Sequence, residues 1–144
     1  MAGGSPFRRL ARRIKDAVAH ARARLSGKRA HLALGSLGED LAVNALTEKG
    51  YRIVARNHKI YGHEIDVIAK DGDTLVFVEV KTRSNRDYGK PLEAIGRKRV
   101  KRLRKAAELY LAKEKIKGVS VRFDAVSVEM TGGKPVVEVV RNAF

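Results

Sequence analysis

Two runs of β-branched and apolar residues, joined by a glycine turn, constrain the fold of this chain more than any other feature. The runs are His63–Ala69 and Thr74–Thr82, and Asp71-Gly72 lies between them. An Asp-Gly pair in this setting predicts a β-hairpin with a two-residue turn. The second run contains Leu75-Val76-Phe77-Val78, which is typical of a strand buried on both faces. The chain is therefore expected to build its core around a sheet.

Charged residues of this hairpin are expected to share one face. With Asp71-Gly72 as the turn, Glu64 would lie opposite Glu79, and Asp66 opposite Phe77. Asp66 and Glu79 would then form a diagonal pair about 7–8 Å apart. Lys81 joins them because alternate residues of a strand point the same way.

Buried charges are costly unless they are paired or bound to a metal. Mg²⁺ prefers oxygen ligands, and a bound divalent ion can activate water for attack on phosphorus. The pattern therefore predicts a metal site at Asp66 and Glu79. Two alternatives remain open: a surface hairpin with solvated charges, and a structural ion pair of Lys81 with Asp66 or Glu79.

Composition restricts the class of protein. A chain of 144 residues with 44% hydrophobic residues is long enough for one domain with a core, which argues against wholesale disorder. The absence of cysteine excludes disulfides, thiolate metal sites and cysteine catalysis. No apolar run reaches the roughly 18–20 residues of a membrane span, and no signal-peptide core is visible. We expect a cytoplasmic protein without a transmembrane segment.

The net charge of +15 indicates a polyanionic partner. Nucleic acid is the expected partner, with an anionic membrane surface or an acidic protein as alternatives. Residues 1–30 carry nine basic residues and one acidic residue, which leaves 22 basic and 15 acidic residues in the remainder. Both parts are basic, so the N-terminal segment does not account for the charge alone.

Residues 1–30 are expected to form a basic extension, partly helical or disordered, ahead of one domain at 31–144. Apolar residues from Phe7 to Leu25 follow a helical stripe, with arginines off it. Such a segment could fold on nucleic acid, lie on a membrane surface, resemble a transit peptide, or dock on the domain as a helical extension. Ser26-Gly27 interrupts the pattern and lies near the expected boundary.

The remaining pattern predicts an α/β fold with helices packed against one sheet. The expected elements are a helix at Leu32–Lys49 capped by Gly50, a strand at Tyr51–Asn57, the hairpin, a polar loop at Ser84–Pro91, a helix at Ile95–Lys113, and strands at Val119–Met130 and Val136–Arg141. Glu39 lies at the edge of the first helix's apolar stripe, from where its carboxylate can face the sheet.

The helix expected at Ile95–Lys113 carries a basic face. Seven cations and no acid occur between residues 97 and 105, a density suited to tracking phosphates as well as to a solvated helix face. Arg99 falls on the apolar stripe, so it either snorkels outward or reaches a buried carboxylate. The nucleic-acid-binding residues predicted from this face are Arg97, Lys98, Lys101, Arg104 and Lys105.

Several short motifs together resemble the bacterial YraN-type (UPF0102) uncharacterised family over about residues 31–141. They are Gly38-Glu39, Gly50-Tyr51, Arg56-Asn57, Glu64-Ile65-Asp66, Val78-Glu79-Val80-Lys81 and Arg122-Phe123-Asp124. That family is regarded as endonuclease-like and related to archaeal Holliday junction resolvases of the PD-(D/E)XK nuclease superfamily. The resemblance implies a restriction-endonuclease-like αβββαβ core with a central mixed sheet flanked by helices.

The resemblance also implies roles for individual residues. Asp66, Glu79 and the Val80 carbonyl would ligate Mg²⁺, with Mn²⁺ as a substitute, and Glu39 would act directly or through water. Lys81 would orient the attacking water or stabilise the phosphate. Nearby carboxylates favour its charged form, so we expect an electrostatic role. Some members use a glutamine in the following helix. This chain has none, so Lys98 or Arg99 would substitute.

The expected function is metal-dependent endonucleolytic hydrolysis of phosphodiester bonds in DNA, including branched or structured DNA. Resolvase kinship implies a homodimer, because two strands require two sites. The main alternative is a non-catalytic nucleic-acid-binding module with a nuclease-like fold. A protein-interaction or membrane-surface adaptor depends only on the N-terminal extension.

Overall fold

The computed structural model of the protein describes residues 12, 16, 27–83, 95–131 and 134–144. Within these ranges the order of elements confirms the expected αβββαβ core followed by a last strand. The elements are α2 (Gly27–Glu48), β1 (Arg52–Ile60), β2 (His63–Asp71), β3 (Thr74–Arg83), α3 (Arg97–Lys113), β4 (Val121–Thr131) and β5 (Lys134–Val140). Apart from Arg12 and Asp16, the expected N-terminal helix lies outside the described residues, as does the polar loop at 84–91.

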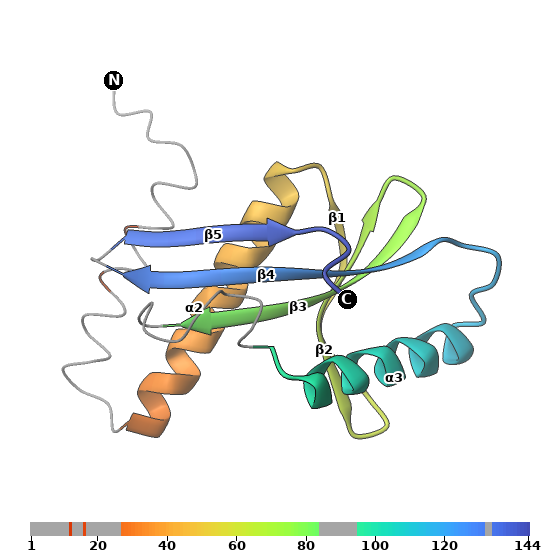
Figure 1. The fold of residues 1–144 in the computed structure, drawn as a ribbon, viewed down its shortest axis with the longest axis horizontal. Coiled ribbons are helices and arrows are strands. Elements are labelled where there is room, and N and C mark those ends of the chain that lie inside the picture. The colour runs from red at the N-terminus through yellow and green to blue at the C-terminus, as the bar shows by residue number, and fades with distance from the viewer. Residues whose placement is uncertain (1–11, 13–15, 17–26, 84–94, 132–133) are drawn as a thin grey trace.

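The five strands form one mixed sheet in the order β1-β2-β3-β4-β5. Neighbouring strands are antiparallel except β3 and β4, which are parallel. A parallel pair requires a crossover connection, and α3 lies in the segment that joins these two strands. Figure 1 shows α3 in front of the sheet and α2 behind it.

Each helix covers one face of the sheet with its own apolar core. Val76 and Val78 of β3 belong to the core beneath α2, together with Leu41 and Leu46 of that helix. The alternate β3 residues Leu75 and Phe77 belong to the core beneath α3. Strand β3 is thus buried on both faces, as its continuous apolar run predicted.

The β2–β3 turn differs from the sequence prediction by one position. Asp71 pairs with Thr74, so the two loop residues are Gly72 and Asp73, not Asp71 and Gly72. Gly72 has a φ of 60°, and a left-handed first loop residue is what a type II′ turn takes from glycine.

This turn moves the pairing by two residues. Phe77 lies opposite Ile68, so the expected pairings of Glu64 with Glu79 and of Asp66 with Phe77 are wrong. A shift of two residues leaves every side chain on its predicted face, because the side-chain period of a strand is two.

Element boundaries differ modestly from the predictions. Helix α2 begins at Gly27, five residues before the expected Leu32, and β1 continues to Ile60 beyond the expected end at Asn57. The predicted cap of α2 is confirmed, since Gly50 has a φ of 91° and its N–H bonds to the carbonyl of Thr47. None of the helices in the described ranges has the length and apolarity needed to cross a bilayer.

Candidate metal centre

The candidate site lies where β2 and β3 separate. Their ladder ends at the pair Val67 and Val78. On either side the neighbouring ladders continue, from β2 to β1 as far as the pair His63 and Ile60, and from β3 to β4 beyond Lys81. The two strands therefore diverge, as Figure 1 shows. We call this gap the fork, and Asp66 and Glu79 are the first residues beyond the last β2–β3 pair.

Asp66 accepts a hydrogen bond from a backbone N–H that has no partner in the β2–β3 ladder at the fork. Its Oδ2 accepts a hydrogen bond of 2.8 Å from the backbone N–H of Val80, which the β2–β3 ladder no longer pairs. The Asp66 side chain is 8% exposed. Its carboxyl group also lies within hydrogen-bonding distance of the Glu79 carboxyl. The structure thus brings together the two residues predicted to form the metal site, now directly across the fork instead of diagonally.

Arg99 of α3 is the cation that reaches these carboxylates. Its Nε donates a hydrogen bond to Glu79 Oε1, and its guanidinium lies 4.0 Å from Asp66 Oδ1. Of the two positions predicted for Arg99, contact with a buried carboxylate is confirmed. Lys81 is half-buried, and within the described residues no ion pair joins it to Asp66 or Glu79. The alternative ion pair of Lys81 is therefore not seen among the described residues, and Arg99 pairs with the carboxylates instead.

Glu39 reaches the fork from α2, which covers the face of the sheet opposite to α3 and Arg99. The residue before it, Gly38, is buried so closely against β3 that an added Cβ would lie 1.9 Å from Thr82 Oγ1. This contact holds α2 against β3. It brings the Glu39 carboxylate into a group with Glu64 and Asp66 whose ligand atoms all lie within 4.8 Å of one another.

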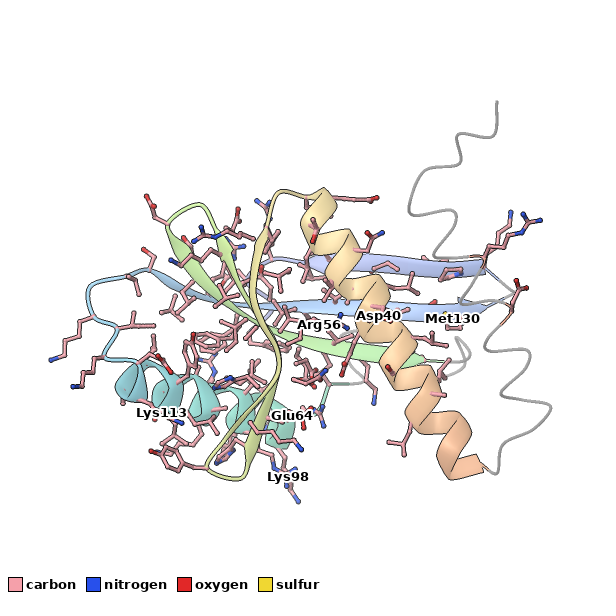
Figure 2. All side chains as sticks on the ribbon, turned by 180° about the vertical axis from the view of Figure 1, so that it is seen from behind. Asp40, Arg56, Glu64, Lys98, Lys113 and Met130 are labelled. Atoms are coloured by element: carbon pink, nitrogen blue, oxygen red, sulfur yellow. The ribbon has the colours of Figure 1, made fainter. Side chains whose placement is uncertain are left out.

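Strand β1 also positions Glu39. The Asn57 side chain hydrogen-bonds to the Glu39 carboxyl group. One residue along each element, Arg56 donates to Asp40 at 2.5 Å across a half-exposed ion pair. Figure 2 shows Asp40 and Arg56 meeting between the helix and the strand. Glu39 is therefore fixed by contacts of α2 with both β3 and β1.

Glu64 is the acidic residue of this group to which the sequence assigned no role. It is exposed, on β2 opposite Lys59, and two residues before Asp66. The Glu-x-Asp spacing was a usable signal, because alternate strand residues share a face. The sequence did not show that the fork would open this face to α2 and let Glu39 approach.

Three acidic residues of the fork, Asp66, Glu79 and Glu39, have raised pKa values. Burial, followed by the negative charge of Glu79, raises the pKa of Asp66 to about 7. Burial also raises the pKa of Glu79, which the hydrogen bond from Arg99 and the charge of Lys81 partly oppose. Burial likewise raises the pKa of Glu39. Three carboxyl groups that resist ionisation together favour the binding of additional positive charge.

The basic face of α3 begins beside the fork. Arg97, Lys98, Lys101, Arg104 and Lys105 are all exposed, as predicted, and the first turn contains no acidic residue. Two of them have local partners: the Arg104 guanidinium lies 5.1 Å from the centre of the Phe123 ring, and Lys105 pairs with Glu108 at 3.5 Å. Figure 2 places Lys98 and Glu64 near one end of this helix.

A second buried acidic group lies on β4, apart from the fork. Asp124 is fully buried and accepts hydrogen bonds from the Tyr51 hydroxyl, the Arg122 guanidinium and the backbone N–H of Asn142. Arg122 also donates to Asp71 at 2.8 Å, near the β2–β3 turn. Burial opposes the charge of Asp124, but these donors together lower its pKa. Both oxygens have donors, so the arrangement is that of a structural group.

Comparison with known proteins places the fork inside a recognised sequence family. The family model of the uncharacterised protein family UPF0102 matches residues 38–128, which include the whole fork. Similar proteins, each named only as a UPF0102 protein, occur in Dictyoglomus thermophilum (42% identical over 113 residues), Geobacter metallireducens (44% over 111) and Symbiobacterium thermophilum (46% over 112). The alignments cover 77% of this chain and 96%, 91% and 95% of those relatives.

Proposed function

This chain belongs to the uncharacterised family UPF0102, and from its fork we propose that it is a Mg²⁺-dependent endonuclease that hydrolyses phosphodiester bonds in DNA. One observation carries the proposal: carboxylates from α2, β2 and β3 converge at the fork with raised pKa values beside a basic helix face. We further propose that the fold is related to the PD-(D/E)XK nucleases. The observed αβββαβ order is consistent with that relation.

The donor set suits a hard divalent cation. Asp66 and Glu79 would be the principal ligands with the Val80 carbonyl, and Glu39 and Glu64 lie close enough to Asp66 to contribute oxygens or hold waters. A cation bound there would neutralise charge developing on the phosphate and make a water molecule more acidic. Mn²⁺, which accepts similar ligands, would substitute for Mg²⁺.

Basic residues around the fork would handle the phosphate. Lys81 follows Glu79 by two residues on the same strand face, so its ammonium can stabilise negative charge at the phosphate. Arg99 already interacts with the carboxylates, and its contact with Glu79 Oε1 would have to break before that oxygen could bind a cation. Arg97, Lys98, Lys101, Arg104 and Lys105 would hold the DNA backbone beside the fork.

A non-catalytic nucleic-acid-binding module is the second candidate, and the basic face of α3 favours it equally well. The two functions differ in their need for metal. A binding module gains nothing from carboxylates that repel phosphates, whereas a nuclease binds DNA more tightly when a divalent cation neutralises them. DNA affinity that does not change on adding Mg²⁺ would favour the binding module. The homodimer expected from kinship with resolvases remains a prediction.

Metal binding and cleavage together test the proposal. Calorimetry should detect Mg²⁺ or Mn²⁺ binding that Asp66→Ala or Glu79→Ala weakens severely, while Asp73→Ala, an exposed acid in the hairpin turn, binds as wild type does. The same proteins should be screened against branched, flapped, single-stranded and duplex DNA. Equal metal binding by all three variants and wild type would reject the site.

Lys81→Ala separates binding from chemistry in this screen. An ammonium cannot ligate a cation, so the variant should retain metal binding while cleavage falls by about 10²–10³-fold, as for the loss of one charge-stabilising donor. If wild type cuts no DNA in either metal, the binding module becomes the better description.

Salt dependence tests the basic face of α3. Each phosphate contact on duplex DNA contributes about 0.9 to the slope of log affinity against log salt. Lys101→Ala combined with Arg104→Ala should therefore make the slope shallower by roughly two. Lys115→Ala combined with Lys117→Ala removes the same charge from exposed positions beyond α3 and provides the control. Equal slopes in the two double variants would mean that the helix face is merely solvated.

A further inference from the structure

The turn between β1 and β2 places a tyrosine where turns of this type usually place asparagine or glycine. Ile60 pairs with His63, so Tyr61 and Gly62 are the two loop residues. Their φ angles are 43° and 78°. Two left-handed residues in succession define a type I′ turn, whose first position favours Asn, Asp or Gly. A bulky side chain in this conformation is uncommon, and such outliers concentrate at functional positions.

The Tyr61 side chain is presented to solvent. It is 72% exposed, more than any other large hydrophobic side chain in the described ranges. Tyr51 and Tyr110 show the contrast, since both are buried in the cores that flank the sheet. The backbone of the turn is well anchored, because Ile60 beside it is 2% exposed and packs in the core beneath α3. The ring is therefore an exposed aromatic on a fixed support.

One lysine lies over this ring, and another is exposed nearby on β1. Lys113, at the end of α3, has its Nζ 5.8 Å from the centre of the Tyr61 ring, and Lys59 is exposed two residues earlier on β1. Helix α3 packs against both strands of this hairpin, and its last residue, Lys113, reaches the turn. Figure 2 shows Lys113 and Lys98 along α3 near the tip of this hairpin. An exposed aromatic ring bordered by lysines matches the chemistry of nucleobases joined by phosphates.

We propose that Tyr61 stacks on an unpaired base, and that the substrates of this protein therefore contain a single-stranded segment next to duplex. The proposal rests on the proposed function for its choice of nucleic acid as ligand. Asp66 follows Tyr61 by five positions, a distance of at most about 17 Å at the rise of a strand, so one DNA molecule can contact both. Bases inside a duplex are already stacked on each other, which leaves the ring no partner there.

Binding to two DNA probes in EDTA, where no strand is cut, tests the proposal. One probe is a blunt duplex, and the other is the same duplex with a single-stranded tail that contains 2-aminopurine. Tyr61→Ala and Tyr61→Asn should bind the tailed probe about 5- to 150-fold more weakly than wild type, the range for loss of one base–aromatic stack. Affinity for the blunt duplex should change less than twofold. Tyr61→Phe should keep the affinity and the quenching of 2-aminopurine fluorescence.

Tyr61→Asn guards against an artefact of misfolding. Asparagine suits the first position of a type I′ turn, so this variant should melt at or above the temperature of wild type while losing affinity for the tail. Leu32→Ala, which removes another exposed hydrophobic side chain, is the matched control and should bind both probes as wild type does. Tailed-probe affinity that is unchanged in Tyr61→Asn, or lost equally on the blunt duplex, would overturn the proposal.

Cleavage in Mg²⁺ distinguishes this proposal from the proposed function. If the protein cuts neither probe but Tyr61→Asn still loses affinity only for the tail, the nuclease function fails and the stacking site stands. If wild type and Tyr61→Asn bind and cut both probes equally, the nuclease function stands and the stacking site is rejected.

Discussion

Asp124 and Asp66 are both buried aspartates on strands of one sheet, yet their surroundings differ in what determines the charge of a carboxylate. Asp124 receives hydrogen bonds from a tyrosine, an arginine and a backbone N–H, and its pKa is lowered. Asp66 has one backbone donor, a second carboxyl group beside it and an arginine 4.0 Å away, and its pKa is raised to about 7.

This contrast separates a structural acid from a candidate functional one. The donors that neutralise Asp124 come from the protein itself, so its charge stabilises the fold without any ligand. The acids of the fork together have fewer donors than their charges need, because Arg99 is the one cation that contacts Asp66 and Glu79 among the described residues. We therefore expect an added cation to stabilise the fork, whereas the Asp124 group is complete.

The largest expected effect comes from breaking the complete group. Arg122→Ala removes the main cation beside a fully buried carboxylate, and removing one partner of a buried pair costs about 3–5 kcal/mol. Arg122 is 20% exposed, so we expect about 3 kcal/mol, measured by urea unfolding. Arg56→Ala is the control, because its ion pair with Asp40 is half-exposed and should contribute less than about 1 kcal/mol. Equal losses in the two variants would show that the Asp124 group has no special structural role.

The second prediction concerns the pH dependence of stability without metal. The folded pKa of Asp66 is raised from 3.8 to about 7, so folding becomes less favourable as pH rises between these values. Asp66→Asn retains an acceptor for Val80 and should remove this loss. The variant should be more stable than wild type at pH 8, by about 2 kcal/mol because the neighbouring Glu79 shares the titration, and the difference should shrink towards pH 4.

Asp124→Asn should behave in the opposite way. The lowered pKa of Asp124 contributes stability above 3.8 that is lost as pH falls through the folded pKa, so this variant should be less stable than wild type at neutral pH. Thermal melts from pH 4 to pH 8 in EDTA provide the measurement for both. Parallel curves for Asp66→Asn and wild type would show that Asp66 carries no such penalty.

The smallest expected effect concerns Arg99. Its guanidinium and a divalent cation would use the same oxygen of Glu79, so Arg99→Ala should bind Mg²⁺ about tenfold more tightly, the equivalent of about 1.4 kcal/mol. Lys98→Ala removes an equal charge from the adjacent exposed position and should change affinity much less. If both variants bind Mg²⁺ equally, Arg99 acts only through its net charge and does not compete for the oxygen.

Much of the fold could be predicted because its signals are local. The β-branched runs gave the hairpin, and apolar periodicity gave both helices. The turn was misplaced because Asp71-Gly72 and Gly72-Asp73 are both acceptable hairpin loops, and local sequence does not choose between them. The error left Asp66 and Glu79 on a common face, which is why their convergence was predicted despite the wrong pairing.

The parts that could not be predicted depend on contacts distant in sequence. Tyr51 and Asp124 are 73 residues apart, and no local pattern indicates that they share a hydrogen bond. The fork itself arises where the β2–β3 ladder ends while the neighbouring ladders continue. No local pattern in the sequence indicates this end, so the approach of Glu39 to Glu64 could not be predicted. For Arg99 the sequence left two possible orientations of the side chain, because an arginine on an apolar stripe must either extend outward to solvent or contact a carboxylate.

The close approach of Gly38 to Thr82 means that a residue without functional groups controls where Glu39 lies. Any side chain at position 38 would overlap Thr82 and move α2 away from β3, taking Glu39 with it, although every acid of the fork would remain in the sequence. Gly35, one turn earlier on the same helix, has no atom within 4 Å of an added Cβ and is free of this restriction. The geometry of the fork therefore depends on glycine at position 38 as well as on its carboxylates.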